Sequence, residues 1–312
     1  MFLGIWNNLV YRYKIKIQPH LKWYIFGFIF IISVASFFVP ADIFSKDLKI
    51  YFFDIGQGDA ALIRTPDHKN ILIDGGPDNS VIYKLGKYLP FYDRKIDLVI
   101  LTHPHADHIT GLVEVLKRYK VERVVFTGVS YYSDAYKEFK ELQREKNIPF
   151  TLALRGRQFI FPLSSGVKND GVKIEILYPF ENLWNKVFSG REEEGGGLND
   201  TSVVNRLDYG KVSFLFTGDA GIEVEKQLIS YNFNLKSLVL KLGHHGSDTA
   251  SSYEFLKAVS PRLAVISVGK NNYGLPRYRI LYRLQQLMIP FLRTDEKGDI
   301  KIRCGLEICH ID

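Results

Sequence analysis

The chain has 312 residues, of which 46% are hydrophobic and 24% are charged. This composition is typical of a globular protein with a substantial core, and no internal repeat or low-complexity tract is evident in the sequence. The formal net charge of +7 and the isoelectric point near 9.1 allow polyanions as partners, but a diffuse basic excess does not by itself indicate nucleic-acid binding.

The N-terminal part of the chain differs from the rest. Residues 23–39 are almost wholly apolar and uncharged, and the run ends at Pro40. Its length lies at the lower limit of the roughly 17 to 25 residues that a bilayer-spanning helix needs. The pattern therefore predicts one transmembrane anchor over residues 23–39, preceded by a basic N-terminal segment over residues 1–22.

The charges that flank this apolar run predict its orientation. Four cations precede the run within the segment 1–22, namely Arg12, Lys14, Lys16 and Lys22. By the positive-inside rule the N-terminus lies in the cytoplasm, and the rest of a single-pass cell-membrane protein lies outside. A cleaved signal peptide is the alternative, which the long basic segment and the lack of a small-x-small cleavage pattern disfavour.

From residue 48 onward the hydrophobic pattern alternates between short strands and amphipathic helices. In the first half we expect helices over residues 80–88, 111–119 and 134–146, and strands over residues 48–54, 60–65, 70–74, 97–102, 122–127 and 150–154. A glycine turn follows the first strand, and we interpret Asp54 and Asp59 beside it as turn-capping residues.

Four potential metal ligands follow the strand predicted at residues 97–102. They are His103, His105, Asp107 and His108. Imidazole and carboxylate together suit zinc, manganese or iron, and so dense a cluster can serve two ions that share one water. The sequence therefore predicts a metal centre in the loop at the end of this strand.

The second half of the chain repeats the alternation of strands and helices. We expect helices over residues 222–230, 253–259 and 280–287, and strands over residues 172–178, 203–207, 212–217, 237–242 and 263–268. Asp219 follows one of these strands, and His244 and His245 follow another. The pattern predicts an α/β layered protein with its functional loops at strand ends on one edge.

Three motifs together resemble those of the metallo-β-lactamase superfamily: His103-x-His105-x-Asp107-His108, Thr217-Gly218-Asp219 and Gly243-His244-His245-Gly246-Ser247. The stretches at residues 53–60, 199–204 and 265–269 resemble the hydrolase domain of the ComEC DNA-uptake proteins in particular. The resemblance implies an αββα sandwich over residues 48–312, which the predicted transmembrane helix would precede.

The resemblance also implies the ligands of two divalent ions, zinc or manganese. His103 and His105 would hold one ion, and Asp107 and His108 would hold the second. Asp107 would also have a catalytic role, because its carboxylate orients the attacking water. Asp219 matches the carboxylate that bridges the two ions.

The role of the paired histidines stays open. His244 would complete the second site, while His245 is either the alternative ligand or a catalytic residue that donates a proton or contacts phosphate. Asp74 is interpreted as a residue that holds a ligand histidine in one tautomer, or as a turn cap.

Two positions depart from the patterns that the resemblance would lead us to expect. Residues 199–202 occupy the place of a third histidine for the first ion, and oxygen ligands there would shift the preference from zinc toward manganese. Leu275 stands where the ComEC pattern has a histidine, and leucine can neither ligate a metal nor donate a proton. His245 or Tyr278 would then have to compensate.

These features predict a membrane-anchored, extracytoplasmic phosphodiesterase, a nuclease that degrades one DNA strand during uptake. Single-stranded DNA is the expected substrate, and a basic-aromatic cluster at residues 277–283 would contact it unless this is merely a solvated helix face. A ComEC-type channel would be a separate polypeptide, because this chain has room for only one span. The alternatives are hydrolysis of a lactam, lactone or phosphocholine ester, and a non-catalytic module that binds DNA or a channel.

The two cysteines lie in the last strand-like stretch of the chain. Cys304 and Cys309 are able to pair outside the cytoplasm, but five residues of separation do not guarantee the geometry of a disulfide. The sequence leaves their state open.

Overall fold

The computed structural model describes residues 19–37, 47–163, 171–188, 197–231 and 233–312. The chain divides into two units, Met1–Ser45 and Lys46–Asp312. The described part of the first unit is a single helix, α2 (Pro19–Phe37), and most of the predicted basic segment lies outside the described residues.

The predicted transmembrane helix over residues 23–39 is not supported. Within the described part of the chain, no helix combines the length and the apolarity that a membrane crossing requires. The last two residues of the predicted span lie outside the described residues.

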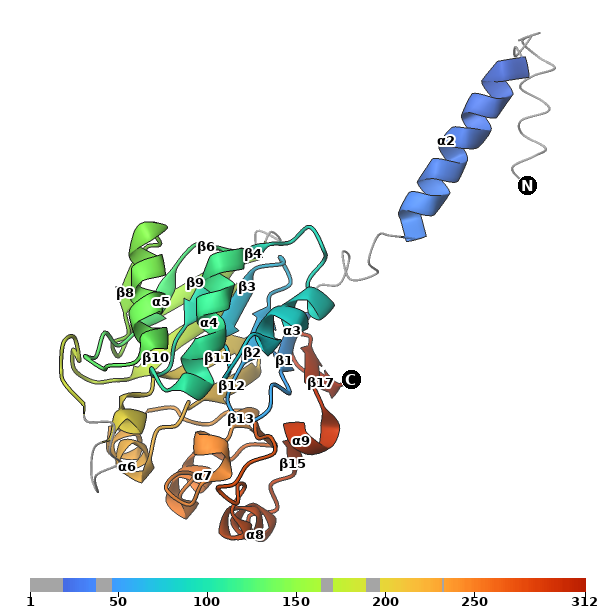
Figure 1. Cartoon of the computed structure of the whole chain (residues 1–312). Coiled ribbons are helices and arrows are strands. Elements are labelled where there is room, and N and C mark those ends of the chain that lie inside the picture. The colour runs from blue at the N-terminus through green and yellow to red at the C-terminus, as the bar shows by residue number, and fades with distance from the viewer. Residues whose placement is uncertain (1–18, 38–46, 164–170, 189–196, 232) are drawn as a thin grey trace. The chain divides into compact units, whose positions relative to one another are not determined.

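The second unit contains a first β-sheet of eight strands (Figure 1). Its strands run in the order β17 (Cys309–Ile311), β16 (Ile300–Cys304), β1 (Leu48–Phe52), β2 (Ala61–Arg64), β3 (Asn70–Ile73), β5 (Leu98–Ile100), β7 (Val124–Phe126) and β8 (Phe150–Leu152). Neighbouring strands from β17 to β3 are antiparallel, and those from β3 to β8 are parallel.

The second sheet has seven strands. Their order is β15 (Phe291–Arg293), β14 (Leu263–Ile266), β13 (Val239–Lys241), β12 (Val212–Phe216), β11 (Val204–Tyr209), β10 (Gly171–Tyr178) and β9 (Gln158–Pro162). Strands β12 to β15 are parallel to one another. A small third sheet pairs β4 (Lys95–Ile96) with β6 (Lys120–Val121).

Three separate hydrophobic clusters show how the layers stack. Successive side chains of a strand point to opposite faces, so Ile50 and Phe52 of β1 lie in the cluster between the two sheets, with Phe214 of β12. Tyr51 and Phe53 point the other way, under the helices that cover the first sheet, α3 (Ser80–Tyr88), α4 (Ala106–Arg118) and α5 (Asp134–Glu145).

The helices α6 (Ile222–Ser230), α7 (Tyr253–Val259) and α8 (Tyr278–Gln286) bury a third cluster against the outer face of the second sheet. Short helices complete the unit: η2 (Leu198–Thr201), η3 (Gly243–Gly246) and α9 (Thr294–Lys297). The order helix, sheet, sheet, helix confirms the predicted αββα sandwich.

Several predicted elements form with the expected bounds, since α3, α6 and α7 begin and end at the predicted residues. The prediction for α4 is wrong at its N-terminus. This helix begins at Ala106, directly after His105 as the N-cap residue, so Asp107 and His108 lie in its first turn. A carboxylate in the first turn is favoured by the helix dipole, and the helix can therefore start inside the ligand motif.

The two cysteines lie in the C-terminal hairpin. Cys304 of β16 and Cys309 of β17 are directly opposite each other in the antiparallel ladder, and a disulfide joins them. The ladder brings the two sulfur atoms together, which the separation in sequence alone did not guarantee.

Candidate metal centre

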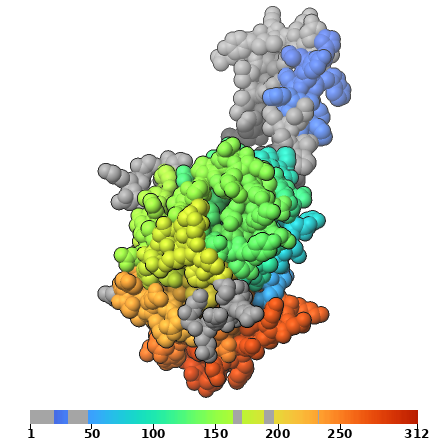
Figure 2. All heavy atoms as spheres, turned by 60° about the vertical axis from the view of Figure 1, so that its left-hand side comes forward, coloured from blue at the N-terminus to red at the C-terminus, as the bar shows by residue number. Residues whose placement is uncertain are grey.

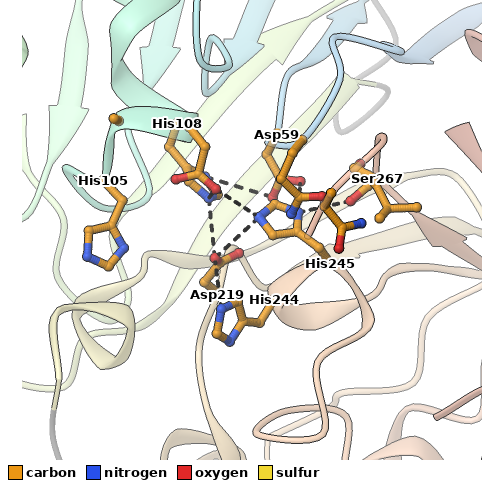
Figure 3. Close-up of polar contacts among 12 residues, drawn as sticks. Asp59, His105, His108, Asp219, His244, His245 and Ser267 are labelled. Atoms are coloured by element: carbon orange, nitrogen blue, oxygen red, sulfur yellow. Dashed lines mark hydrogen bonds and ion pairs between the residues drawn. The ribbon is translucent and has the colours of Figure 1, made fainter. Parts of the chain in front are cut away.

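Loops from both sheets meet at one edge of the sandwich, where polar contacts join Asp59, His108, Asp219 and His245 and where His105 lies to one side (Figure 3). Because β3 and β5 are parallel, and β12 and β13 are parallel, the loops that leave their C-terminal ends emerge together within each sheet. The tertiary fold thus brings together residues that are more than 130 positions apart in the sequence.

Three of the predicted ligands and the alternative ligand His245 form one compact group. The ligand atoms of Asp107, His108, Asp219 and His245 all lie within 4.8 Å of one another. His245 Nε2 is 3.2 Å from Asp107 Oδ2 and 3.5 Å from Asp219 Oδ2. His108 Nε2 is 3.4 Å from the same oxygen of Asp219. Two imidazoles and two carboxylates at this spacing suit a divalent transition-metal ion.

The orientation of His108 tests whether the group fits a metal. Its Nδ1 lies 2.9 Å from Asp74 Oδ2, an arrangement that places the ring proton on Nδ1 and leaves the lone pair on Nε2. Among the described residues, His108 Nε2 and Asp219 Oδ1 are buried without a hydrogen-bond partner. Each such atom costs about 1 to 3 kcal/mol, a penalty that coordination would remove. The residues therefore fit a metal ion, and Asp74 lies where we expected a residue that orients a ligand histidine.

Strong mutual electrostatics mark the same group. Burial favours the neutral imidazole of His245, but Asp219 and Asp59 outweigh it and raise the pKa of His245 to about 10. Burial also raises the pKa of Asp219, but His245 and His108 together hold it well below its usual range. In the absence of a cation, protonated histidines therefore balance the carboxylates, and a metal ion would replace those protons.

His103 and His105 form a second pair of nitrogen ligands beside this group. His103 Nε2 is 3.0 Å from His105 Nδ1, and the ring of His103 lies 4.2 Å from that of His108. Burial lowers the pKa of His103 well below its usual value, so the imidazole is neutral, as a metal ligand must be. Hydroxyls of Thr102 and Ser202 lie 3.2 and 3.3 Å from His103 Nδ1, on the side away from His105.

The backbone between β13 and α7 separates the two adjacent histidines. His244 and His245 both have positive φ, 47° and 52°, and Gly246 follows with 80°. Left-handed backbone costs about 1 to 2 kcal/mol for each residue with a Cβ atom, so the surrounding contacts must hold the turn. The amide of His244 donates to the carbonyl of Gly218 at 3.2 Å, and His245 Nδ1 lies 2.9 Å from the carbonyl of Ser267.

This turn directs the two side chains to different places. His245 lies in the four-residue group, whereas His244 Nε2 is 3.9 Å from Asp219 Oδ2 and 3.5 Å from Asn199 Nδ2. His244 Nδ1 lies 2.8 Å from Thr249 Oγ1. The geometry thus favours His245, which the sequence left open as the alternative ligand. His244 lies at the border of the group, beside residues 199–202, which occupy the place of a third histidine.

The sequence interpretation missed a buried ion pair beneath the site. Lys241, at the end of β13, forms an ion pair with Asp59, and its Nζ lies 3.2 Å from the carbonyl oxygen of Gly218. Burial opposes the charge on Lys241, but Asp59 and Asp219 raise its pKa. Asp59 Oδ1 also lies 3.4 Å from His245 Nδ1, so this carboxylate faces the site and does not cap its own turn. A lysine at the end of an otherwise apolar strand is the one sequence signal for it.

Leu275 lies in the loop that precedes α8. Its amide donates to Asn271 Oδ1 at 3.0 Å, and its half-buried side chain packs against the cluster under α6 to α8. The next residue, Pro276, contacts Gly246, where an added Cβ would lie only 2.6 Å from the proline ring. This loop therefore borders the histidine turn but offers no proton donor at residue 275.

Comparisons with known proteins agree with this geometry. The sequence is 31% identical to ComE operon protein 3 of Bacillus subtilis over 83% of this chain, and 31% identical to competence protein ComA of Neisseria gonorrhoeae over 85% of it. The chain spans only 33% and 34% of these two proteins, which are ComEC-like competence proteins.

The fold is also similar to that of a solved structure, the metallo-beta-lactamase fold protein YhfI from Bacillus subtilis. The TM-score is 0.52 at 14% identity, over 83% of this chain and 100% of the other. Residues 53–270 match the metallo-beta-lactamase superfamily, and this region includes every predicted ligand. With its sandwich fold and its cluster of metal-ligating residues, the chain belongs to the metallo-beta-lactamase superfamily.

Proposed function

We propose that the protein is a phosphodiesterase that binds two divalent metal ions and acts as a nuclease on single-stranded DNA during DNA uptake. The observation that carries this proposal is the pair of adjacent ligand sets: His103 with His105, and His108 and His245 with their two carboxylates. Two adjacent sets suit two ions, because a single ion does not need six ligands of this kind.

The proposed chemistry divides between the ions and the protein. When bound, the ions polarise the scissile phosphate and lower the pKa of the attacking water. Asp107 is the one carboxylate of the four-residue group that is not buried, so it can accept a hydrogen bond from that water. Lys241 and the carboxylates of Asp59 and Asp219 are buried, and they form a rigid polar layer beneath the site. The segment 199–202, which supplies oxygen and amide groups, favours manganese over zinc for the first ion.

The similarity to competence proteins supports DNA as the substrate. The matched region is about a third of each of these competence proteins, and we propose a ComEC-type channel as a partner of this hydrolase. The net charge of +7 favours an anionic substrate over a neutral lactam or lactone.

The decisive experiment compares substrates with the purified full-length protein in manganese and in zinc. We expect cleavage of single-stranded DNA and of a chromogenic phosphodiester, and complete loss of both activities in EDTA. Hydrolysis of a chromogenic lactam or lactone without cleavage of DNA would contradict the proposal and favour a small or cell-envelope substrate. Bound metal without turnover on any of these compounds would identify a non-catalytic module that binds DNA or a channel.

The proposal includes attachment to the cell membrane through the N-terminal segment, with the hydrolase outside. It rests on the uncharged apolar sequence of residues 23–39 and on the cations before it. The disulfide between Cys304 and Cys309 suits the same location, because disulfides persist in oxidising compartments and are rare in the cytosol.

This topology predicts the result of a protease experiment. A protease added to intact cells without their outer layer is expected to digest the region after Pro40, while a cytoplasmic control protein stays intact. In the same cells the two cysteines should resist alkylation until a reductant is added. Protection from the protease together with freely alkylated cysteines would place the hydrolase in the cytoplasm.

A further inference from the structure

A cavity of about 380 Å³ lies apart from the metal ligands, between α5, β8 and the segment at residues 183–188. Figure 2 turns this side of the molecule forward, with the segment near residue 180 in yellow against α5 and β8 in green. The volume falls in the range of about 300 to 1,000 Å³ that small-ligand sites occupy. None of the residues in the metal centre lines this cavity.

Stacked aromatic rings form one wall of the cavity. Phe150 and Trp184 have ring centroids 5.8 Å apart and planes only 12° from parallel. Their exposed fractions are 44% and 43%, so each ring still presents surface to a ligand. Flat, exposed rings of this kind bind planar partners by stacking.

The backbone holds Trp184 firmly in this position. Gly128 has a positive φ of 74°, and a Cβ atom there would lie 2.2 Å from the Trp184 ring, so only glycine allows the close approach. The amide of Asn185 donates to the carbonyl of Gly128 at 2.9 Å, and the amide of Ser130 donates to the carbonyl of Lys186 at 2.7 Å. The indole is therefore positioned before any ligand arrives.

Two cations of α5, Lys140 and Arg144, also line the cavity. Lys140 Nζ lies 4.2 Å from the ring centroid of Tyr136, and Arg144 lies one turn further along the helix. In the described part of the chain, neither cation forms an ion pair with a carboxylate, and burial together with Arg144 lowers the pKa of Lys140. Uncompensated positive charge beside aromatic rings suits a ligand that is both planar and anionic.

The cavity is connected to the metal centre through one short segment. Val129 and Ser130 line the cavity, and the next residue, Tyr131, meets the ring of His105 edge-on with centroids 6.0 Å apart. The cavity is therefore one residue along the chain from a side chain that contacts a candidate metal ligand.

We propose that the cavity is a nucleobase subsite, in which one base of a single-stranded DNA stacks on Trp184 and Phe150 while an adjacent phosphate contacts Lys140 and Arg144. This inference rests on the proposed nuclease function and deepens it. The basic-aromatic cluster of α8 is the competing surface. There Tyr278 and Tyr282 stack on each other, and Arg283 donates to the carbonyl oxygen of Ser251.

The first test measures the affinity of the full-length protein for a fluorescent dT oligonucleotide with phosphorothioate linkages, which resist cleavage. Trp184→Ala is expected to weaken binding about 5- to 140-fold, because stacking on one aromatic residue contributes about 1 to 3 kcal/mol. Hydrolysis of the small chromogenic phosphodiester should stay unchanged. Phe91→Ala is the control, because this more exposed ring lies in the loop between α3 and β4.

The second test uses charge and does not depend on the packing of Trp184. Each phosphate contact on a single strand contributes about 0.7 to the slope of log affinity against log salt concentration. Lys140→Met should therefore reduce this slope by about 0.7. Lys137→Met is the matched control on the same helix, an exposed lysine that does not line the cavity, and it should leave the slope unchanged.

The outcomes separate this inference from the proposed function. If the protein cleaves single-stranded DNA but Trp184→Ala and Lys140→Met bind it like the parent protein, the subsite is refuted and the nuclease function stands. Loss of affinity in Tyr278→Ala alone would assign the base to α8 and likewise refute it. If the parent protein neither binds nor cleaves single-stranded DNA, the proposed function fails and the subsite fails with it.

Discussion

Asp219→Ala is expected to abolish both metal binding and hydrolysis. Asp219 lies within 3.5 Å of both His108 and His245, so it is the carboxylate that closely approaches both histidines of the four-residue group. Mutations of residues that only support a ligand cost about 10- to 100-fold in metal affinity, so removal of the ligand itself should exceed 100-fold. Activity should fall by at least about 10²- to 10³-fold, because the charge stabilisation supplied by the metal is lost with it.

Metal content by mass spectrometry and hydrolysis of the chromogenic phosphodiester check this prediction. Asp54→Ala is the control, because the amide of Asp54 donates to Asp299 Oδ1 at 3.0 Å and Asp54 is not part of the ligand group. We expect this variant to change the stability more than the metal content. An Asp219→Ala protein that retains both ions would remove Asp219 from the metal centre.

His245→Ala and His244→Ala are expected to differ sharply although the residues are adjacent. His245 belongs to the four-residue group, so its loss should lower metal affinity more than about 100-fold and remove activity. His244 lies at the border of the group, and its loss should leave most of the metal in place. Isothermal titration of each variant with manganese or zinc measures this difference.

The number of protons released on metal binding provides an independent readout. Because the carboxylates raise the pKa of His245 to about 10, the imidazole carries a proton at pH 7 and must lose it before it can ligate. Metal affinity should therefore rise with pH below 10, and His245→Ala should release about one proton fewer per site than the parent protein. Equal proton release in both proteins would show that His245 is not a ligand.

The sequence by itself determined the fold class and indicated most of the residues that form the candidate metal centre. Short β-branched runs alternate with amphipathic segments along the chain. The fold class could be predicted because this hydrophobic periodicity is local and can be read directly from the sequence. The ligands of the first motif, His103 to His108, are neighbours along the chain, so their clustering is also visible without a structure. Asp219 could be assigned because its motif, which follows a predicted strand, resembles that of the metallo-β-lactamase superfamily.

Only the tertiary structure decided the contacts between distant segments. Whether His244 or His245 joins the ligand group depends on the left-handed backbone of both residues and on the hydrogen bond between His245 Nδ1 and the carbonyl of Ser267. Local periodicity in the sequence encodes neither feature. The ion pair of Asp59 with Lys241 joins residues 182 positions apart, one in a glycine turn and the other at the end of a strand of the opposite sheet. Such pairs depend on how the two sheets pack face to face. A buried charge is costly unless it is paired, and here the oppositely charged partner comes from the other sheet.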